Sequence, residues 1–316
     1  MGVLAAAAAL LAAAPARAAS KVSHVSLRDV AARYGLKTSA PGPKSLVLRS
    51  QWTQWTFQLN TREAICNGTV VWLQSPAAMP GGRWSIASGD LYRTLDPIMR
   101  PRSLLSAYRC RTIVLDPGHG GSDTGAISRN GRREKDLVLQ IARRIRAALV
   151  NEGFRVVMTR DNDRTMDLEP RCAVAASARA DLFLSLHINA AIDRSARGVE
   201  TFALATAGYA STAGGARPTS ASYTGNRHDH ANLFLAYTIQ RNLRTLTFQP
   251  DRGVRRARFL VLRNAPCPAA LIEFGFLSNS TEERLMISET HQQRIADAVA
   301  QAVKSYAQTV KAAAGP

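Results

Sequence analysis

The sequence predicts an α/β protein in which a layered sheet with flanking helices follows a small, β-rich α+β domain. From residue 111 onward, apolar runs of strand length alternate with longer stretches of helical periodicity, which is typical of α/β layers. Before residue 101, short strands and a hairpin signal predominate. The 316 residues, 46% of them hydrophobic, are enough to build two cores. We therefore expect domains over residues 22–101 and 111–307, and a tail over residues 308–316.

The first domain is expected to be a packing or binding module, because its titratable residues do not cluster. Residues 25–35 indicate a strand followed by a short helix, and residues 88–97 indicate one capped helical turn. Asn67-Gly68, between two apolar runs, is the strongest two-residue hairpin signal. Four tryptophans are assigned to the core in preference to a sugar-stacking surface: Trp52, Trp55, Trp72 and Trp84.

The second domain carries unusual residues where its predicted strands end. Strands are expected over residues 112–116, 154–160, 181–189, 198–204 and 269–274, and helices over 137–149, 168–180, 232–246 and a final stretch ending near 307. In open sheets of this kind, chemistry gathers beyond the carboxyl ends of the strands. His119, His187 and Glu273 each lie at or just past such an end.

The stretch "LDPGHGGSDTGA", residues 115–126, exposes one histidine, His119, among glycines. It fits neither GxGxxG nor GxxxxGK, so a phosphate-binding loop is not expected. His119, His187 and the helix-start residue Glu134 together form a ligand set that suits a hydrolytic zinc site with an open position. Such an ion polarises a carbonyl and lowers the pKa of a bound water. Glu273, after a buried strand, suits the general base.

Each of these four residues also has an ordinary structural interpretation. A histidine is common in turns or as a hydrogen-bonded core residue, an acid is favoured in the first turn of a helix, and a buried glutamate often pairs with an arginine. Spacing alone does not decide between these interpretations, because the four residues lie far apart in the sequence.

Several motifs resemble a known enzyme family. They are "TIVLDPGHGGSDTGA", "EKD", "MTRDNDR", "ADLFLSLHINA" and "RFLVLRNAPCPAALIEFGFLSN". Together they resemble the zinc-dependent N-acetylmuramoyl-L-alanine amidases of the amidase_3 type, over residues 111–307. The resemblance implies Zn²⁺ held by His119, Glu134 and His187, with Glu273 as the catalytic residue. It also implies cleavage of the amide between N-acetylmuramic acid and L-alanine in peptidoglycan, for cell-wall remodelling or cell separation.

Two other functions stay open: a zinc peptidase that cuts within the stem peptide, and a peptidoglycan-binding protein without catalysis. Peptidoglycan is the expected partner, a protein activator is left open, and neither nucleic acid nor a second copy of the chain is expected. Residues 22–101 resemble the copper-amine-oxidase-like stalk domain of some exported wall enzymes, and this resemblance brings no copper site with it.

The first residues predict export. Residues 1–18 are apolar and end in Ala16-Arg17-Ala18, which indicates a signal peptide cut before Ala19. This leader has no Lys or Arg before Arg17, which indicates an atypical leader or a truncated start, and an uncleaved Ala-rich helix is the alternative. No other segment has the length of a membrane span. The expected location is therefore the periplasm or the exterior, where a formal charge of +18 favours an anionic wall polymer.

Neither the loop over residues 205–230 nor the cysteines are expected to bind the metal. Residues 205–230 are rich in Gly, Ala, Ser and Thr, which predicts a mobile loop without a helix that blocks the site. His228 and His230 are assigned to a solvated part of this loop. The cysteines have no CxxC spacing, so buried thiols and one or two disulfides are both open: Cys66, Cys110, Cys172 and Cys267.

Overall fold

The structure is a computed structural model that describes residues 22–212 and 218–315. The predicted leader, residues 1–18, lies outside the described residues. Within the described ranges, every helix is too short or too polar to cross a membrane.

The described chain begins with short strands and helices and then alternates between the two types. The strands are β1 (His24–Ser26), β2 (Lys37–Gly42), β3 (Ser45–Arg49), β4 (Gln54–Gln58), β5 (Glu63–Cys66), β6 (Thr69–Trp72), β7 (Ser85–Ala87), β8 (Thr112–Pro117), β9 (Arg155–Met158), β10 (Leu182–Asn189), β11 (Val199–Leu204), β12 (Asp251–Ala257) and β13 (Ala269–Phe276). The helices are α1 (Leu27–Tyr34), α2 (Ser88–Asp90), α3 (Asp96–Met99), α4 (Glu134–Asn151), α5 (Leu168–Ser177), α6 (Asp229–Thr247), α7 (Leu260–Asn264), α8 (Ser280–Ile287) and α9 (Glu289–Ala313). Short helical turns are η1 (Pro80–Gly82), η2 (Leu91–Leu95), η3 (Pro101–Ser103) and η4 (Thr224–His228).

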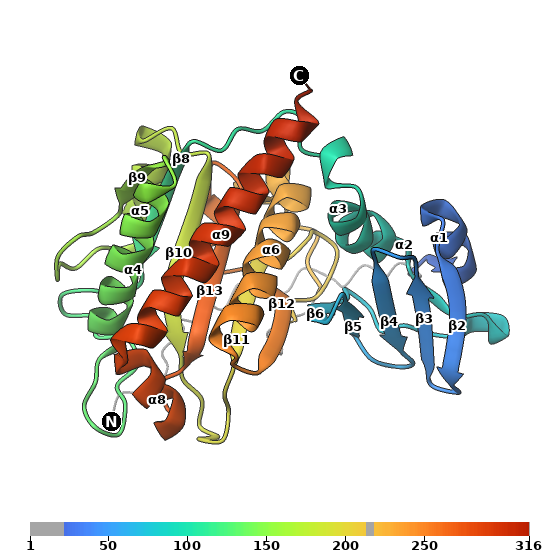
Figure 1. Ribbon diagram of the computed structural model, residues 1–316, viewed down its shortest axis with the longest axis horizontal. Helices are drawn as coiled ribbons and strands as arrows, with labels where there is room; N and C mark the ends of the chain where they lie inside the picture. The colour runs from blue at the N-terminus through green and yellow to red at the C-terminus, as the bar shows by residue number, and fades with distance from the viewer. Residues whose placement is uncertain (1–21, 213–217, 316) are drawn as a thin grey trace.

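Among the described residues, eleven strands form one sheet in the order β2-β3-β4-β5-β6-β12-β11-β13-β10-β8-β9. The strands β13, β10, β8 and β9 run parallel, whereas β11 is antiparallel to β13. The carboxyl ends of β8, β10 and β13 therefore lie at one edge of the sheet (Figure 1). This edge carries the candidate site.

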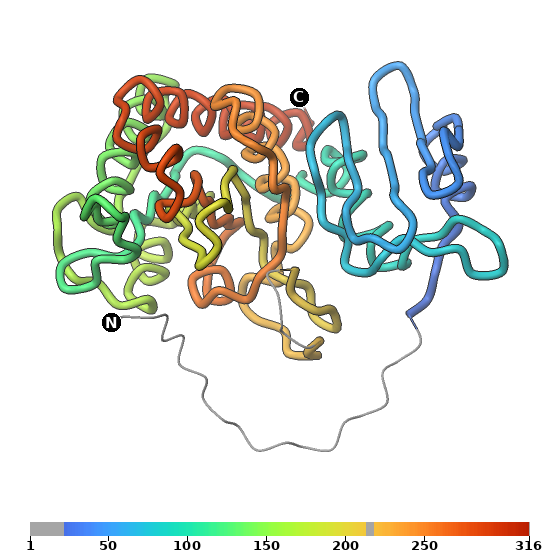
Figure 2. Tube along the Cα trace, turned by 90° about the horizontal axis from the view of Figure 1, so that it is seen from below, coloured from blue at the N-terminus to red at the C-terminus, as the bar shows by residue number. Residues whose placement is uncertain are grey.

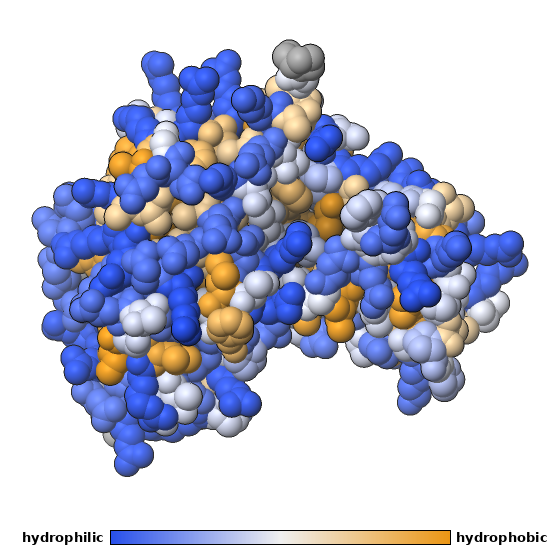
Figure 3. All heavy atoms as spheres, viewed as in Figure 1, coloured by the Kyte–Doolittle hydropathy of each residue, from blue (hydrophilic) through white to orange (hydrophobic). Residues whose placement is uncertain are grey.

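Helices cover both faces of the second half of the sheet. The apolar sides of α4, α6 and α9 pack on one face, where Leu137, Ile141, Ile145 and Leu149 of α4 are all at most 5% exposed. Their opposite sides face solvent, and the face seen in Figure 3 is accordingly mostly hydrophilic. Helices α5 and α7 contribute to a second apolar cluster on the other face of the sheet. The expected α/β layering is thereby confirmed.

The sheet of the first domain continues into the sheet of the second. Strand β6 pairs with β12 in parallel through Val71 and Val254, and a hydrophobic cluster contains residues of both halves. Val70 N donates to Asp251 Oδ2 over 2.8 Å, and Trp72 Nε1 donates to the backbone oxygen of Arg252 over 3.0 Å. The two halves lie side by side in both Figure 1 and Figure 2.

The predicted hairpin forms at Asn67-Gly68, where both residues have positive φ between β5 and β6. Four strands were not expected from the sequence: β2, β3, β7 and β12. Strand β2 is mostly polar, β3 has only a short apolar run, β7 is three residues long and β12 is rich in arginine, so none shows a strong apolar alternation. Helix α9 also extends to Ala313, six residues beyond the expected end near 307.

The assignment of the tryptophans to the core is correct for Trp55, which is fully buried, and wrong for Trp52, which is 80% exposed in a turn. Trp72 and Trp84 are half-buried. The cysteines are free thiols, three of them buried and Cys110 half-buried, so the buried-thiol interpretation agrees with the structure.

Candidate active site

The turn after β8 presents His119 in a backbone conformation that non-glycine residues rarely adopt. The φ of His119 is 61°, in the left-handed region. Two reciprocal backbone hydrogen bonds between Gly120 and Asp123, at 2.9 and 3.1 Å, close the turn. The Asp123 carboxylate lies 2.8 Å from His119 Nδ1, so this contact fixes the ring and directs Nε2 toward the site.

Glu134 begins α4, and its side chain is only 6% exposed. Its Oε1 lies 3.2 Å from His119 Nε2 and 3.0 Å from His187 Nδ1. Backbone amides of Ala126 and Ile188 also donate to this carboxylate, at 2.9 and 3.1 Å. Burial opposes ionisation, but hydrogen bonds from the two histidines hold the pKa of Glu134 well below its usual value. For His119, burial acts to lower the pKa, and the hydrogen bond and charge of Glu134 outweigh it and raise the pKa.

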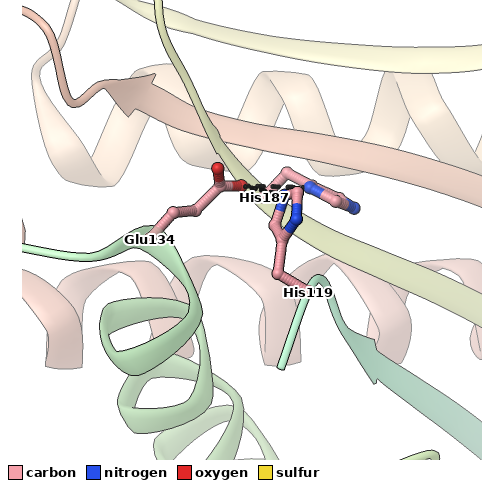
Figure 4. Close-up of side chains that lie close together, drawn as sticks. All are labelled: His119, Glu134 and His187. Carbon is pink, nitrogen blue, oxygen red and sulfur yellow. Dashed lines mark hydrogen bonds and ion pairs between the residues drawn. The ribbon is translucent and has the colours of Figure 1, made fainter. Parts of the chain in front are cut away.

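The three predicted ligands converge. One donor atom from each of His119, Glu134 and His187 lies within 4.8 Å of the others, and the side chains point toward one another from the β8 turn, the start of α4 and strand β10 (Figure 4). Two imidazoles and a carboxylate are a donor set that zinc prefers. The residues present therefore fit a zinc ion.

Glycines make room for this convergence. A Cβ at Gly118 would lie 2.2 Å from the His187 ring, and one at Gly125 would lie 2.6 Å from Glu134 Oε2. These contacts explain why His119 is surrounded by glycines: larger residues would fill the space that the ligand side chains occupy.

Glu273 lies beside this cluster. It is paired in register with His187 on β10 and with Glu200 on β11, so the three side chains lie in one row on one face of the sheet. Its Oε2 is buried and has no hydrogen-bond partner among the described residues. Burial, followed by the negative charges of Glu134 and Glu200, raises the pKa of Glu273 well above its usual value. A carboxyl group whose pKa is raised in this way is suited to take up and return a proton during a reaction.

The profile of the family described as N-acetylmuramoyl-L-alanine amidase, Amidase_3, matches residues 113–305. The chain belongs to this family. The prediction of an N-acetylmuramoyl-L-alanine amidase is thereby confirmed.

Curated relatives include two amidases of Escherichia coli. AmiC is 37% identical over 243 residues, which cover 69% of this chain and 58% of AmiC. AmiA of strain K12 is 33% identical over 258 residues, which cover 72% of this chain and 86% of AmiA. The chain thus spans somewhat more than half the length of AmiC and most of AmiA.

A solved structure has the same fold as the second half of this Amidase_3 chain. The N-acetylmuramoyl-L-alanine amidase from Clostridium difficile 630 aligns with a TM-score of 0.53 and 34% identity, over 63% of this chain and 98% of that one. This agreement confirms the predicted fold class.

Sequence reasoning missed two acids next to the site. Asp123 orients His119, and Glu200 lies opposite Glu273. Asp123 is four residues after His119 in the quoted loop, and this spacing was an available signal. The position of Glu200 depends on strand register, which the sequence does not reveal. Asn189, the last residue of β10, donates to Glu200 Oε1 over 2.8 Å.

The histidines at 228 and 230 lie apart from the metal cluster found in the described residues. The expectation of a solvated loop is wrong for them: both are half-buried, on η4 and the first turn of α6. His228 lies 3.3 Å from the Tyr108 hydroxyl and 3.2 Å from the Pro266 carbonyl. The described residues between 205 and 223 form no helix, but the end of the predicted loop forms η4 and the start of α6, so the loop is shorter than expected.

Proposed function

We propose that this amidase uses zinc to hydrolyse the amide bond between N-acetylmuramic acid and L-alanine in peptidoglycan. The observation that carries the proposal is the convergence of His119, Glu134 and His187 beside Glu273, whose Oε2 has no hydrogen-bond partner in the described part of the chain. Three metal ligands next to an acid with a raised pKa form an arrangement suited to the hydrolysis of an unactivated amide.

The residues have separate tasks in this proposal. His119, Glu134 and His187 would hold the ion, which when bound supplies Lewis-acid chemistry and activates water. Glu273 Oε2 takes a proton from the attacking water as its oxygen bonds to the carbonyl carbon. When the carbon–nitrogen bond breaks, Glu273 returns that proton to the nitrogen of the departing L-alanine. Asp123 holds the His119 ring in place through Nδ1.

We further propose that the protein acts outside the cytoplasm, in the periplasm or after secretion. The apolar first residues support export, and the formal charge of +18 suits a wall polymer that carries many carboxylates. The first half of the chain is then a module attached to the enzyme, in the manner of a stalk domain.

Mass analysis of digested peptidoglycan tests the reaction. Purified sacculi are incubated with the full chain, then with the chain after chelator treatment, and finally with zinc restored. The expected products are glycan with free lactyl groups and intact stem peptides, formed only when zinc is present. Shortened stem peptides would instead indicate a peptidase. Sacculi bound without any cleavage would indicate a binding protein, and cleavage without an added partner would show that no activator is needed.

A further inference from the structure

Two buried arginines lie behind the turn that carries His119. Arg160, two residues after β9, is 1% exposed, and Arg171, in α5, is 3% exposed. Arg160 belongs to the "MTRDNDR" motif. Neither arginine takes part in the proposed reaction. Fully burying a guanidinium is unfavourable unless its N–H groups find partners, so the partners indicate what the residue does.

These partners are consecutive backbone carbonyls of the β8 turn. Arg160 donates to the carbonyls of Pro117 and Gly118 at 2.9 and 2.7 Å. Arg171 donates to those of Pro117 and His119 at 3.0 and 2.9 Å. Three successive peptide groups, up to and including that of His119, are therefore held by charge-assisted hydrogen bonds.

The same arginines join this turn to the elements around it. Arg160 also donates to the carbonyl of Lys135, next to Glu134, at 2.9 Å. Arg171 also donates to Asp116 Oδ1 at 2.8 Å, on the strand that leads into the turn. Arg160 thus ties the His119 turn to the helix start that carries the second ligand.

The loop between β9 and α5 holds the turn from its outer side. Asp163 Oδ1 accepts from Gly121 N at 2.7 Å, and Asp163 Oδ2 lies 2.7 Å from Lys135 Nζ, which also donates to the Gly121 carbonyl. Thr165 Oγ1 accepts from Ser122 N at 3.1 Å. A non-glycine residue in the left-handed conformation, such as His119, is strained and persists only where its surroundings hold it.

We propose that Arg160, Arg171 and Asp163 form a clamp that positions His119 for metal binding, and that this clamp sets the affinity for zinc. The inference rests on the proposed function, because it requires that His119 be a ligand. The three are positioning residues: within the described part of the chain their hydrogen bonds go to the backbone of the turn and its neighbours and to no proposed ligand atom.

Zinc affinity of the intact chain tests the clamp. The variants are Arg160→Lys, Arg171→Lys and Asp163→Asn, and zinc dissociation constants are measured by competition with a chelating dye. We expect a constant about 10 to 100 times higher for each lysine variant, as for other residues that orient metal ligands, and a smaller, severalfold rise for the exposed Asp163. Arg155→Lys is the matched control, because Arg155 is exposed and donates to the Ala178 carbonyl, away from the turn.

A second measurement separates positioning from stability. Imidazole signals of the metal-free variants are recorded by NMR, and unfolding in urea is followed in parallel. The clamp predicts shifted or broadened His119 signals, with the signals of buried His291 unchanged. Asp163→Asn keeps the test available if a lysine variant does not fold, since Asp163 is half exposed.

The outcomes of the two measurements are distinct. If the wild-type chain binds zinc and the folded variants bind it equally well with unchanged His119 signals, the clamp is refuted and the proposed function stands. If the wild-type chain binds no zinc, the proposed function itself fails.

Discussion

Glu200 and Glu273 lie directly opposite each other on β11 and β13, and their carboxyl groups have contrasting environments. Glu200 accepts from Asn189 at 2.8 Å and pairs with Arg252 and Arg255 at 3.1 and 2.8 Å. Glu273 Oε2 has no partner among the described residues. Glu200 is therefore part of a hydrogen-bonded ion-pair network, whereas the described residues leave one oxygen of Glu273 available for proton exchange.

Glu273→Gln is expected to remove cleavage and keep zinc. Glutamine has the same shape but accepts no proton from water, so we expect the turnover number on peptidoglycan to fall by at least about a hundredfold. Zinc content after dialysis and the urea midpoint should match the wild type. Turnover close to the wild-type value would exclude Glu273 as the base.

Glu200→Gln is expected to destabilise the fold. The substitution leaves Arg252 and Arg255 without their carboxylate, next to a buried strand. Because the Arg252 side chain is 33% exposed, water compensates in part, and we expect a loss of about 2 to 3 kcal/mol in the free energy of unfolding.

The control for Glu200 is Glu289→Gln. Glu289 pairs with Arg144 at 3.2 Å, but its side chain is 85% exposed, so the expected loss is below about 0.5 kcal/mol. Equal losses for the two variants, measured by urea denaturation, would contradict the buried network.

Gly118→Ala is expected to weaken metal binding. Its Cβ would lie 2.2 Å from the His187 ring, so the ring must leave the position in which it contacts Glu134 or the turn must shift. We expect zinc affinity to fall by at least about tenfold, judged by competition with a chelating dye. Gly42→Ala, with open space around its Cβ, serves as the control and should bind zinc normally.

Gly253→Ala is expected to disturb the junction of the two halves. Gly253 has φ +90°, and its Cβ would lie 2.8 Å from the Val70 carbonyl oxygen, where β12 approaches β6. Gly208 has a similar φ of +87° with open space around it, so Gly208→Ala carries the same backbone strain without the clash. We expect Gly253→Ala to cost about 1 to 3 kcal/mol more in unfolding free energy than Gly208→Ala. Equal costs would show that close approach at this junction is unimportant.

Buried His291 is expected to make stability fall in mild acid. Burial, and then the positive charge of Arg294, lowers the pKa of His291 to about 4. The unfolded chain, with a histidine pKa of about 6.5, binds more protons between these two values, so stability is lost as the pH falls through this range. We expect a loss of about 2 kcal/mol between pH 7 and pH 5 from this residue.

His291→Gln isolates that contribution, because glutamine does not titrate and still donates to Gln249 Oε1, which lies 3.1 Å from His291 Nε2. Urea unfolding of the two metal-free proteins at both pH values gives the difference directly. An identical pH dependence in both would rule out the assignment to His291.

The candidate site was largely predictable because its residues come at the ends of recognisable strands. His119 follows one apolar run, while His187 and Glu273 lie within others, and parallel strands bring such ends to one edge of a sheet. Glu134 was predictable because "EKD" opens a strongly periodic helix. The supporting residues were not predictable in this way. Arg160 and Arg171 act on backbone carbonyls more than forty residues away, and their own sequence surroundings give no sign of those partners.

The sequence by itself determined the alternation of strands and helices, the hairpin at Asn67-Gly68 and the residues that carry the proposed chemistry. These features follow from local periodicity, turn preference and residue type. The tertiary structure decided that β6 pairs with β12, that Glu200 lies opposite Glu273, and that two arginines hold the turn of His119. Strand register and buried polar contacts join segments distant in the chain, and their energy depends on which groups exclude water together.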